Sequence, residues 1–135
     1  MRLADRTTLH VVVLFFYPRD NSAGCTREAC GFRDNYADFQ AAGAEVIGLS
    51  GGTTETKQQF VENNKLPYTL LTDADGAVAN AYGLGKTFFG LVPARVTFVI
   101  DRKGIIRHRF ESGTNMLKHV DEALRTVRSL TGVPA

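Results

Sequence analysis

Two cysteines in this chain have a residue type and a spacing that suggest a reactive site. Cys25 and Cys30 are its only cysteines, and they stand five positions apart in the stretch YPRDNSAGCTREACGF, residues 17–32. A redox pair or half of a zinc site is normally spaced C-x-x-C, whereas this pair is C-x-x-x-x-C. Two cysteines with scattered histidines do not supply the four ligands that zinc needs. We therefore predict a pair of reactive thiols and no metal site.

Cys25 is predicted to lie at the N-terminus of a helix. Pro18 ends the preceding apolar run, because proline cannot donate to a strand ladder, and RDNSAG is a turn sequence. The helix that follows has an apolar face at spacings of three and four, formed by Ala29, Phe32, Tyr36 and Phe39. Cys25 continues this series backward by four positions. Unpaired backbone N–H groups and the helix dipole favour an anion there, so we expect a thiolate at Cys25.

The two thiols are predicted to be too far apart to bond while this helix is intact. Five positions correspond to roughly 500° of turn, which places the two Cα atoms about 8.7 Å apart in an ideal helix. A disulfide needs roughly 4.4 to 6.8 Å between Cα atoms. If Cys25 and Cys30 are a redox pair, the helix must unwind locally between catalytic steps.

Alternating strand and helix patterns surround this stretch. Apolar and β-branched runs predict strands over residues 10–17, 45–50, 68–73, 95–100 and 105–110. Helical spacing predicts helices over residues 26–41, 54–64, 76–82 and 116–130. The last two strands flank Asp101–Gly104, a hairpin sequence. The order indicates one α/β domain, residues 1–135, with a mixed central β-sheet flanked by helices on both faces, which is the outline of a thioredoxin-like fold.

The bulk composition is that of a soluble globular protein. The 135 residues are 44% hydrophobic and 22% charged, and the net charge of +2 is too small to imply nucleic acid or a membrane surface as a partner. The longest apolar run, residues 11–16, is too short to span a bilayer. The N-terminal MRLADRTTLH carries no visible secretory signal. We expect a reducing compartment, either a bacterial cytoplasm or a plastid if a transit peptide has been removed.

The sequence PRDNSAGC resembles the peroxiredoxin motif P-x-x-x-(T/S)-x-x-C, with Pro18, Ser22 and Cys25 in register. The longer FYPRDNSAGCTREACGFRD is similar to the peroxiredoxin Q subfamily, also called bacterioferritin comigratory protein, which places a second cysteine five residues after the first. The likeness continues through GAEVIGLS, KLPYTLLTD and GLVPARVTFVIDRKGIIRH to the C-terminal helix. It covers nearly the whole chain from about residue 9.

The resemblance implies a thiol-dependent peroxidase that reduces hydrogen peroxide and organic hydroperoxides without a cofactor, in antioxidant defence. Cys25 would be the peroxidatic nucleophile and become a sulfenic acid. Ser22 would hydrogen-bond the thiolate and the peroxide, Pro18 would shield the pocket from water, and Arg95 would keep the thiolate ionised and stabilise developing charge. Cys30 would resolve the sulfenic acid into an intramolecular disulfide, which thioredoxin or a similar dithiol would reduce. The subfamily also implies a monomer.

Two features depart from the family pattern. Ser22 stands where threonine is commoner, which keeps the hydroxyl group. The chain also starts almost directly at its first long strand, where peroxiredoxins usually carry an N-terminal β-hairpin. Either the sequence is truncated or the fold survives without the hairpin. We expect activity to persist, because every motif residue is present, and an open sheet edge to reduce stability and solubility.

Other interpretations of the same residues compete with these roles. Cys25 and Cys30 could be small core residues, Ser22 could simply cap the helix, and Arg95 could be a surface arginine. Phe88 and Phe89 lie in a predicted loop, where they either pack on the core or form an apolar collar round the substrate mouth. Three histidines show no ligand spacing and are interpreted as structural: His10, His108 and His119.

Two other classes of protein share the predicted fold. A thioredoxin-like protein disulfide oxidoreductase would carry C-x-x-C at the helix start and usually a proline where Val96 stands, and both are missing. A non-catalytic binding module would have no reason to keep Pro18, Ser22, Cys25 and Arg95 together. We therefore expect a peroxidase, with the disulfide oxidoreductase as the alternative.

Overall fold

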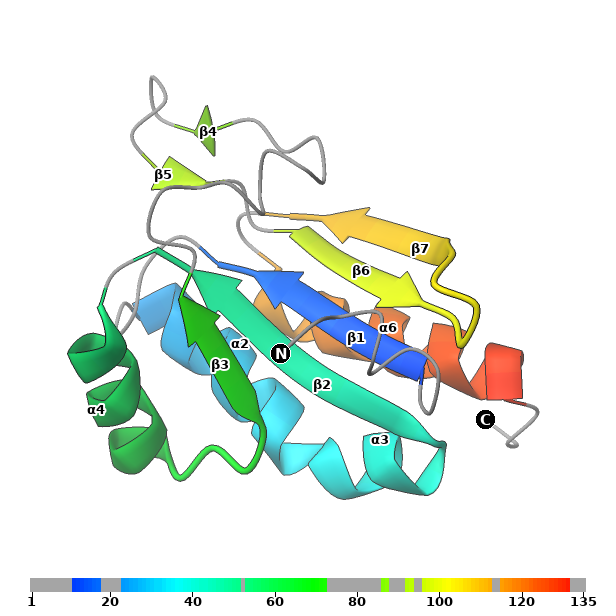
Figure 1. Ribbon diagram of the computed structural model, residues 1–135, viewed down its shortest axis with the longest axis horizontal. Coiled ribbons are helices and arrows are strands. Elements are labelled where there is room, and N and C mark those ends of the chain that lie inside the picture. The colour runs from blue at the N-terminus through cyan, green and yellow to red at the C-terminus, as the bar shows by residue number, and fades with distance from the viewer. Residues whose placement is uncertain are drawn as a thin grey trace.

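A five-stranded mixed sheet forms the centre of the protein, in the order β3-β2-β1-β6-β7 (Figure 1). The computed structural model describes residues 11–17, 23–51, 53–72, 86–87, 92–93, 96–112 and 115–131. Its strands are β1 (Val11–Phe16), β2 (Ala44–Ser50), β3 (Thr69–Thr72), β6 (Val96–Ile100) and β7 (Ile106–Glu111), with a separate short pair, β4 (Lys86–Thr87) and β5 (Val92–Pro93). Its helices are α2 (Ala23–Asp34), α3 (Tyr36–Ala41), α4 (Thr54–Asn64) and α6 (Met116–Thr131). The five predicted strands of the sheet are confirmed, each to within two residues at either end.

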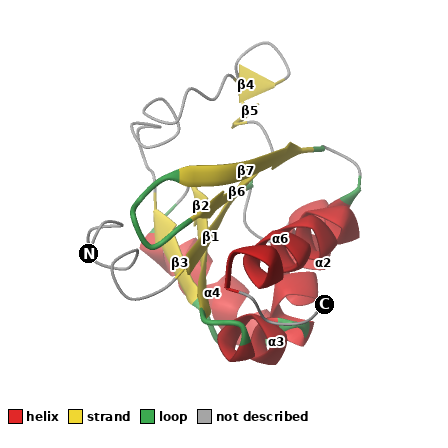
Figure 2. Ribbon diagram, turned by 90° about the vertical axis from the view of Figure 1, so that its right-hand side faces the viewer, coloured by secondary structure: helices red, strands yellow, loops and turns green. Residues whose placement is uncertain are grey.

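The strand pairing explains why α2, α3 and α4 lie on one face of the sheet. β1 pairs in parallel with β2, and β2 in parallel with β3, whereas β6 is antiparallel to both β1 and β7. Parallel neighbours need a crossover, which α2 and α3 supply between β1 and β2, and α4 supplies between β2 and β3. Two right-handed crossovers in the same direction place their helices on the same face, and Figure 2 shows the described helices gathered on one side. The helix predicted over residues 76–82 lies outside the described residues.

Strand β1 is buried on both of its faces. Every residue from Val11 to Tyr17 is at most 2% exposed. Val13, Phe15 and Tyr17 belong to the core under the helices, and their neighbours belong to the second apolar cluster on the opposite face. Because both faces are buried, the sequence of this strand is an unbroken apolar run and does not alternate between apolar and polar residues.

The predicted helix over residues 26–41 is in fact two helices that meet at Asn35. The Asn35 side-chain Nδ2 donates to Gly31 O at 2.9 Å, and such a local bond competes with continued helical pairing. The chain bends there, with Asn35 at φ −108° and ψ 9°, and α3 begins at Tyr36. The predicted apolar face survives the break, because Ala29, Phe32 and Phe39 are all fully buried in one core.

The hairpin predicted at Asp101–Gly104 is confirmed. Asp101 Oδ1 accepts hydrogen bonds from Lys103 N at 2.9 Å and Ile105 N at 3.0 Å. Gly104 has φ 81°, a left-handed conformation that glycine adopts without a steric cost. The turn connects β6 to β7, and the predicted C-terminal helix follows as α6. Among the helices of the described residues, none is long and apolar enough to cross a membrane.

Candidate active site

Helix α2 carries both cysteines. It runs from Ala23 to Asp34, so Cys25 is its third residue and Cys30 its eighth. The backbone N–H of Cys25 therefore belongs to the first turn, whose donors have no partner within the helix. Five helical positions separate the two Cα atoms by about 8.7 Å, beyond the range of a disulfide. The helix predicted to hold these two residues apart is thus present in the structure.

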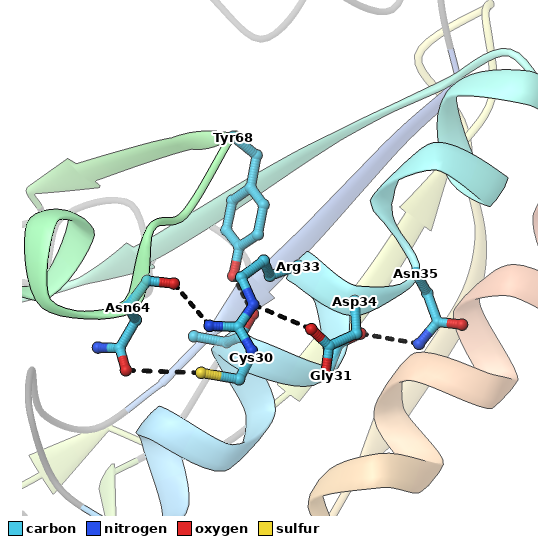
Figure 3. A network of polar contacts seen from close by, with 8 residues as sticks. Cys30, Gly31, Arg33, Asp34, Asn35, Asn64 and Tyr68 are labelled. Carbon is cyan, nitrogen blue, oxygen red and sulfur yellow. Dashed lines mark hydrogen bonds and ion pairs between the residues drawn. The ribbon is translucent and has the colours of Figure 1, made fainter.

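Cys30 is a free thiol that contacts the end of helix α4 (Figure 3). Its Sγ donates to Asn64 Oδ1 at 3.5 Å, and the side chain is partly buried. Asn64 Nδ2 donates in turn to Phe60 O at 3.0 Å. Because the amide nitrogen is used by Phe60, the amide oxygen of Asn64 is the atom that faces the thiol.

Arg33 makes a second bond between the same two helices. Its Nη1 donates to Asn64 O at 2.7 Å, and its Nε donates to Asp34 Oδ1 at 2.9 Å (Figure 3). A cation is favourable at the carbonyl end of a helix, which is where Asn64 ends α4. The hydrogen bond to Asp34 raises the pKa of Arg33. Sequence reasoning missed both Arg33 and Asn64. Arg33 stands three positions after Cys30, a spacing that could have indicated it, but Asn64 carries no local signal.

Tyr68, which directly precedes strand β3, forms a hydrogen bond to α2. Its hydroxyl donates to Ala29 O at 2.6 Å, and the residue is only 5% exposed. Burial raises the pKa of Tyr68 far above its ordinary value, so the phenol stays protonated and remains a donor. Through Tyr68 and Asn64, one side of α2 is bonded to the segment that leads from α4 into β3.

The opposite side of α2 contacts α6 through a buried acid and a histidine. Glu28 Oε2 lies 3.4 Å from His119 Nδ1, and both side chains are fully buried. His119 is thus structural, as predicted. His108 Nε2 lies 3.7 Å from Glu122 Oε2, between β7 and α6. Nothing in the spacing of these residues indicated a partner for either histidine.

The remaining predicted site residues fall outside the described part of the chain. These are Pro18, Ser22 and Arg95, together with His10, Phe88 and Phe89, and for Cys25 the backbone alone is described. Their roles stay predictions. In the part of the chain that the structure describes, no three His, Cys, Asp or Glu side chains form a cluster that could hold a metal ion.

Comparison with known sequences identifies relatives of this chain. The AhpC/TSA family matches residues 1–109. The chain is 44% identical over 119 residues to "Peroxiredoxin Q, chloroplastic" of Suaeda salsa, which covers 88% of this chain and 56% of that protein. It is 42% identical over 119 residues to the protein of the same name in Sedum lineare, covering 88% and 64%. The chain therefore spans between about half and two thirds of the length of these relatives.

Comparison with solved structures confirms the thioredoxin-like α/β fold. The crystal structure of peroxidoxin BcpB from Mycobacterium tuberculosis matches with a TM-score of 0.89 and 36% identity, over 96% of this chain and 86% of that one. A peroxiredoxin Q mutant from Xylella fastidiosa matches with a TM-score of 0.86 and 25% identity, over 96% and 82%. Sequence and structure agree, and the chain belongs to the AhpC/TSA family as a homologue of the peroxiredoxin Q proteins.

Proposed function

We propose that this chain is a thiol-dependent peroxidase that reduces hydrogen peroxide and organic hydroperoxides, with Cys25 as the peroxidatic and Cys30 as the resolving cysteine. The observation that carries the proposal is helix α2, which holds Cys25 in its first turn and Cys30 five positions later. Free backbone N–H groups and the helix dipole favour a thiolate in that first turn. The similarity to peroxiredoxin Q proteins supports the same assignment.

The first step is the reaction of Cys25 with peroxide. The thiolate attacks one oxygen of the peroxide, the O–O bond breaks, and the other oxygen leaves with a proton as water or an alcohol. Cys25 is then a sulfenic acid. Ser22 orients the peroxide, Pro18 excludes water, and Arg95 stabilises the charge that develops on the oxygens. Arg95 directly precedes Val96, and Val96 pairs with Phe16 at the end of β1, two positions before Pro18. This register supports a common site.

The second step is resolution by Cys30. Once α2 has unwound locally, the Cys30 thiolate attacks the Cys25 sulfur, an S–S bond forms, and the sulfenic oxygen leaves as water. A dithiol such as thioredoxin then attacks the disulfide, restores both thiols and is itself oxidised to a disulfide. The bond between Cys30 and Asn64 must break for this step, because Sγ has to leave α4 to reach Cys25.

The setting that we propose is a reducing compartment and a monomeric enzyme without nucleic acid or membrane partners. The relatives in Suaeda salsa and Sedum lineare are named as chloroplastic. Their names support a plastid as one location, beside a bacterial cytoplasm. A thioredoxin or similar dithiol would be available as the reductant in either compartment.

The decisive experiment is peroxide consumption coupled to thioredoxin, thioredoxin reductase and NADPH. The native chain should turn over, and Cys25→Ser should consume no peroxide, since a hydroxyl is far less ionised than a thiol. Cys30→Ser should consume about one equivalent and stall as a sulfenic acid, visible by mass after trapping. Full turnover by Cys25→Ser would contradict the assignment. Reduction of insulin disulfides without peroxide use would instead favour the protein disulfide oxidoreductase.

A further inference from the structure

Glu28 is a fully buried acid at the centre of the segment between the two cysteines. Acidic side chains are almost never fully buried unless they are paired, and one partner of Glu28 is His119 on α6, with Oε2 and Nδ1 3.4 Å apart. Helices α2 and α6 lie side by side on the same face of the sheet (Figures 1 and 2). The pair therefore connects the helix that carries the cysteines to the C-terminal helix.

The histidine side of this pair is fixed to the sheet. His119 Nε2 lies 2.8 Å from Ser112 O, and since a carbonyl oxygen can only accept, Nε2 carries a proton. Nδ1 lies 2.8 Å from Thr97 Oγ1 on β6 and 3.4 Å from Glu28 Oε2. His119 is thus held from two further directions, by Ser112 and by Thr97.

Close packing next to Glu28 leaves α2 little room to move. A Cβ atom on Gly31 would lie 3.0 Å from Val120 Cγ2 and 3.3 Å from Leu117 Cδ2, both on α6. The turn of α2 that follows Glu28 thus rests directly on α6. To bring the Cα atoms of Cys25 and Cys30 from about 8.7 Å into the range of a disulfide, the backbone between them must leave the helical conformation. Glu28 lies within this segment, so we expect the change to withdraw it from His119.

We propose that Glu28 and His119 form a latch that holds α2 helical and thereby sets the balance between the dithiol and disulfide forms of the protein. The latch rests on the proposed function, because it assumes that Cys25 and Cys30 bond after α2 unwinds. An interaction that exists only in the dithiol form stabilises that form alone, so removing it shifts the equilibrium toward the disulfide. Glu28 is in this sense a positioning residue. It acts through the helix on which Cys25 and Cys30 lie.

The test is a redox titration of the full chain in glutathione buffers, with melting temperatures of both forms. Glu28→Ala should shift the equilibrium toward the disulfide by about tenfold, a reduction potential about 30 mV more negative. It should lower the melting temperature of the dithiol form and leave that of the disulfide form unchanged. The matched control is Glu122→Ala, which removes the acid of the other His–Glu pair, between α6 and β7. It should shift both forms alike and leave the equilibrium unchanged.

Equal destabilisation of both redox forms by Glu28→Ala, with an unchanged equilibrium, would overturn the latch and leave a purely structural pair. If Glu28→Ala does not fold, Glu28→Gln keeps the shape of the side chain and replaces its carboxyl group by an amide. It should shift the equilibrium in the same direction by a smaller factor. An unshifted equilibrium in Glu28→Gln would then overturn the proposal.

Hydrogen exchange separates this proposal from the proposed function. If peroxide produces no Cys25–Cys30 disulfide in the native chain, as seen by peptide mapping, the proposed function fails. The latch can still be measured in the dithiol form, where Glu28→Ala should accelerate amide exchange over residues 26–31 by about tenfold and Glu122→Ala should not. Unchanged exchange in Glu28→Ala overturns the latch whether or not the disulfide forms.

Discussion

The hydrogen bond of Tyr68 to α2 makes a contribution to the free energy of unfolding that can be measured. The Tyr68 hydroxyl donates to Ala29 O at 2.6 Å in a buried setting. Tyr68→Phe keeps the ring and leaves that carbonyl without this donor, so the free energy of unfolding of the dithiol form should fall by about 1 kcal/mol. Urea unfolding under reducing conditions measures the loss. Tyr36→Phe is the matched control, since Tyr36 bonds Glu45 from α3 in a part-buried position. A loss no larger than that of Tyr36→Phe would refute the prediction.

The stabilisation by this bond should depend on pH, because the Tyr68 hydroxyl donates only while it is protonated. Burial raises the pKa of Tyr68 in the folded protein, whereas the pKa of an unfolded tyrosine is about 10. The folded state then holds a proton that the unfolded state releases, so the contribution of Tyr68 is complete below about pH 10 and falls as the pH rises further. The stability difference between the native chain and Tyr68→Phe should shrink in that alkaline range.

Arg95 is the residue whose role depends most on the family resemblance, and kinetics can test it directly. Arg95→Ala should slow sulfenic acid formation by about 100-fold, because a fixed donor to the developing charge is lost. Arg95→Lys should restore only part of the rate, since lysine lacks the planar fork. Rapid-quench measurement of peroxide reduction gives the second-order rate. Arg125→Ala, at an exposed position of α6, is the control. A native rate in Arg95→Ala would remove Arg95 from the site.

The β6–β7 hairpin depends on one carboxylate, that of Asp101. The backbone N–H of Ile105, with smaller contributions from Lys103 and Arg107, lowers the pKa of Asp101. A lowered folded pKa stabilises the protein above the unfolded value of about 4, and the effect is lost as the pH falls through the folded pKa. Asp101→Ala should therefore lower the melting temperature at pH 7 and have a smaller effect at a pH below the folded pKa. Asp121→Ala, at an exposed position of α6, should have little effect at either pH.

The elements themselves were the most predictable part of the structure. The strands β1 and β6 could be predicted because each is an apolar run, and strands buried on both faces do not alternate between apolar and polar residues. The break at Asn35 could not be predicted in the same way, since the apolar spacing of three and four continues from Phe32 to Phe39 across it. A periodic pattern reports which side chains are buried, but it does not report whether the backbone between them stays helical.

The contacts of the candidate site were less predictable for a different reason. Cys30 and Asn64 are 34 positions apart, and Asn64 has no feature that distinguishes it from other helix-terminal residues. Glu28 and His119 are farther apart still and meet because α2 and α6 pack side by side on one face of the sheet. Sequence reasoning could place both cysteines on one helix. The residues that contact this helix come from distant parts of the sequence, and the order of the strands in the sheet brings them next to it.

Helix α2 is bonded on two sides to the rest of the described structure. On one side are the bonds to Asn64 and Tyr68, and on the other side is the bond to His119. All of them start from residues 28–33 of α2, the segment that includes and follows the turn that must unwind. The strand pairs of the sheet and the contacts of α6 with β6 and β7 do not involve this segment. Local unwinding can therefore occur without global unfolding.

The dithiol and disulfide forms of the native chain should differ in hydrogen exchange and in melting temperature. In the dithiol form, residues 26–31 should exchange slowly, as expected of an intact helix. In the disulfide form they should exchange fast and expose apolar side chains such as Phe32, to which a dithiol reductant could dock. β1 should stay protected in both forms and is the internal control.

The disulfide form should also melt at a lower temperature, although a cross-link normally stabilises a protein. A loop of only about five residues restricts the unfolded chain less than the long loops for which disulfides stabilise most. Against this small gain, the disulfide form loses the buried bonds of Glu28 and Ala29 as well as the packing of Phe32. Equal exchange of residues 26–31 in the two forms would mean that Cys25 and Cys30 meet in another way, between two chains for example. In that case the disulfide would be intermolecular, and non-reducing electrophoresis would show a dimer.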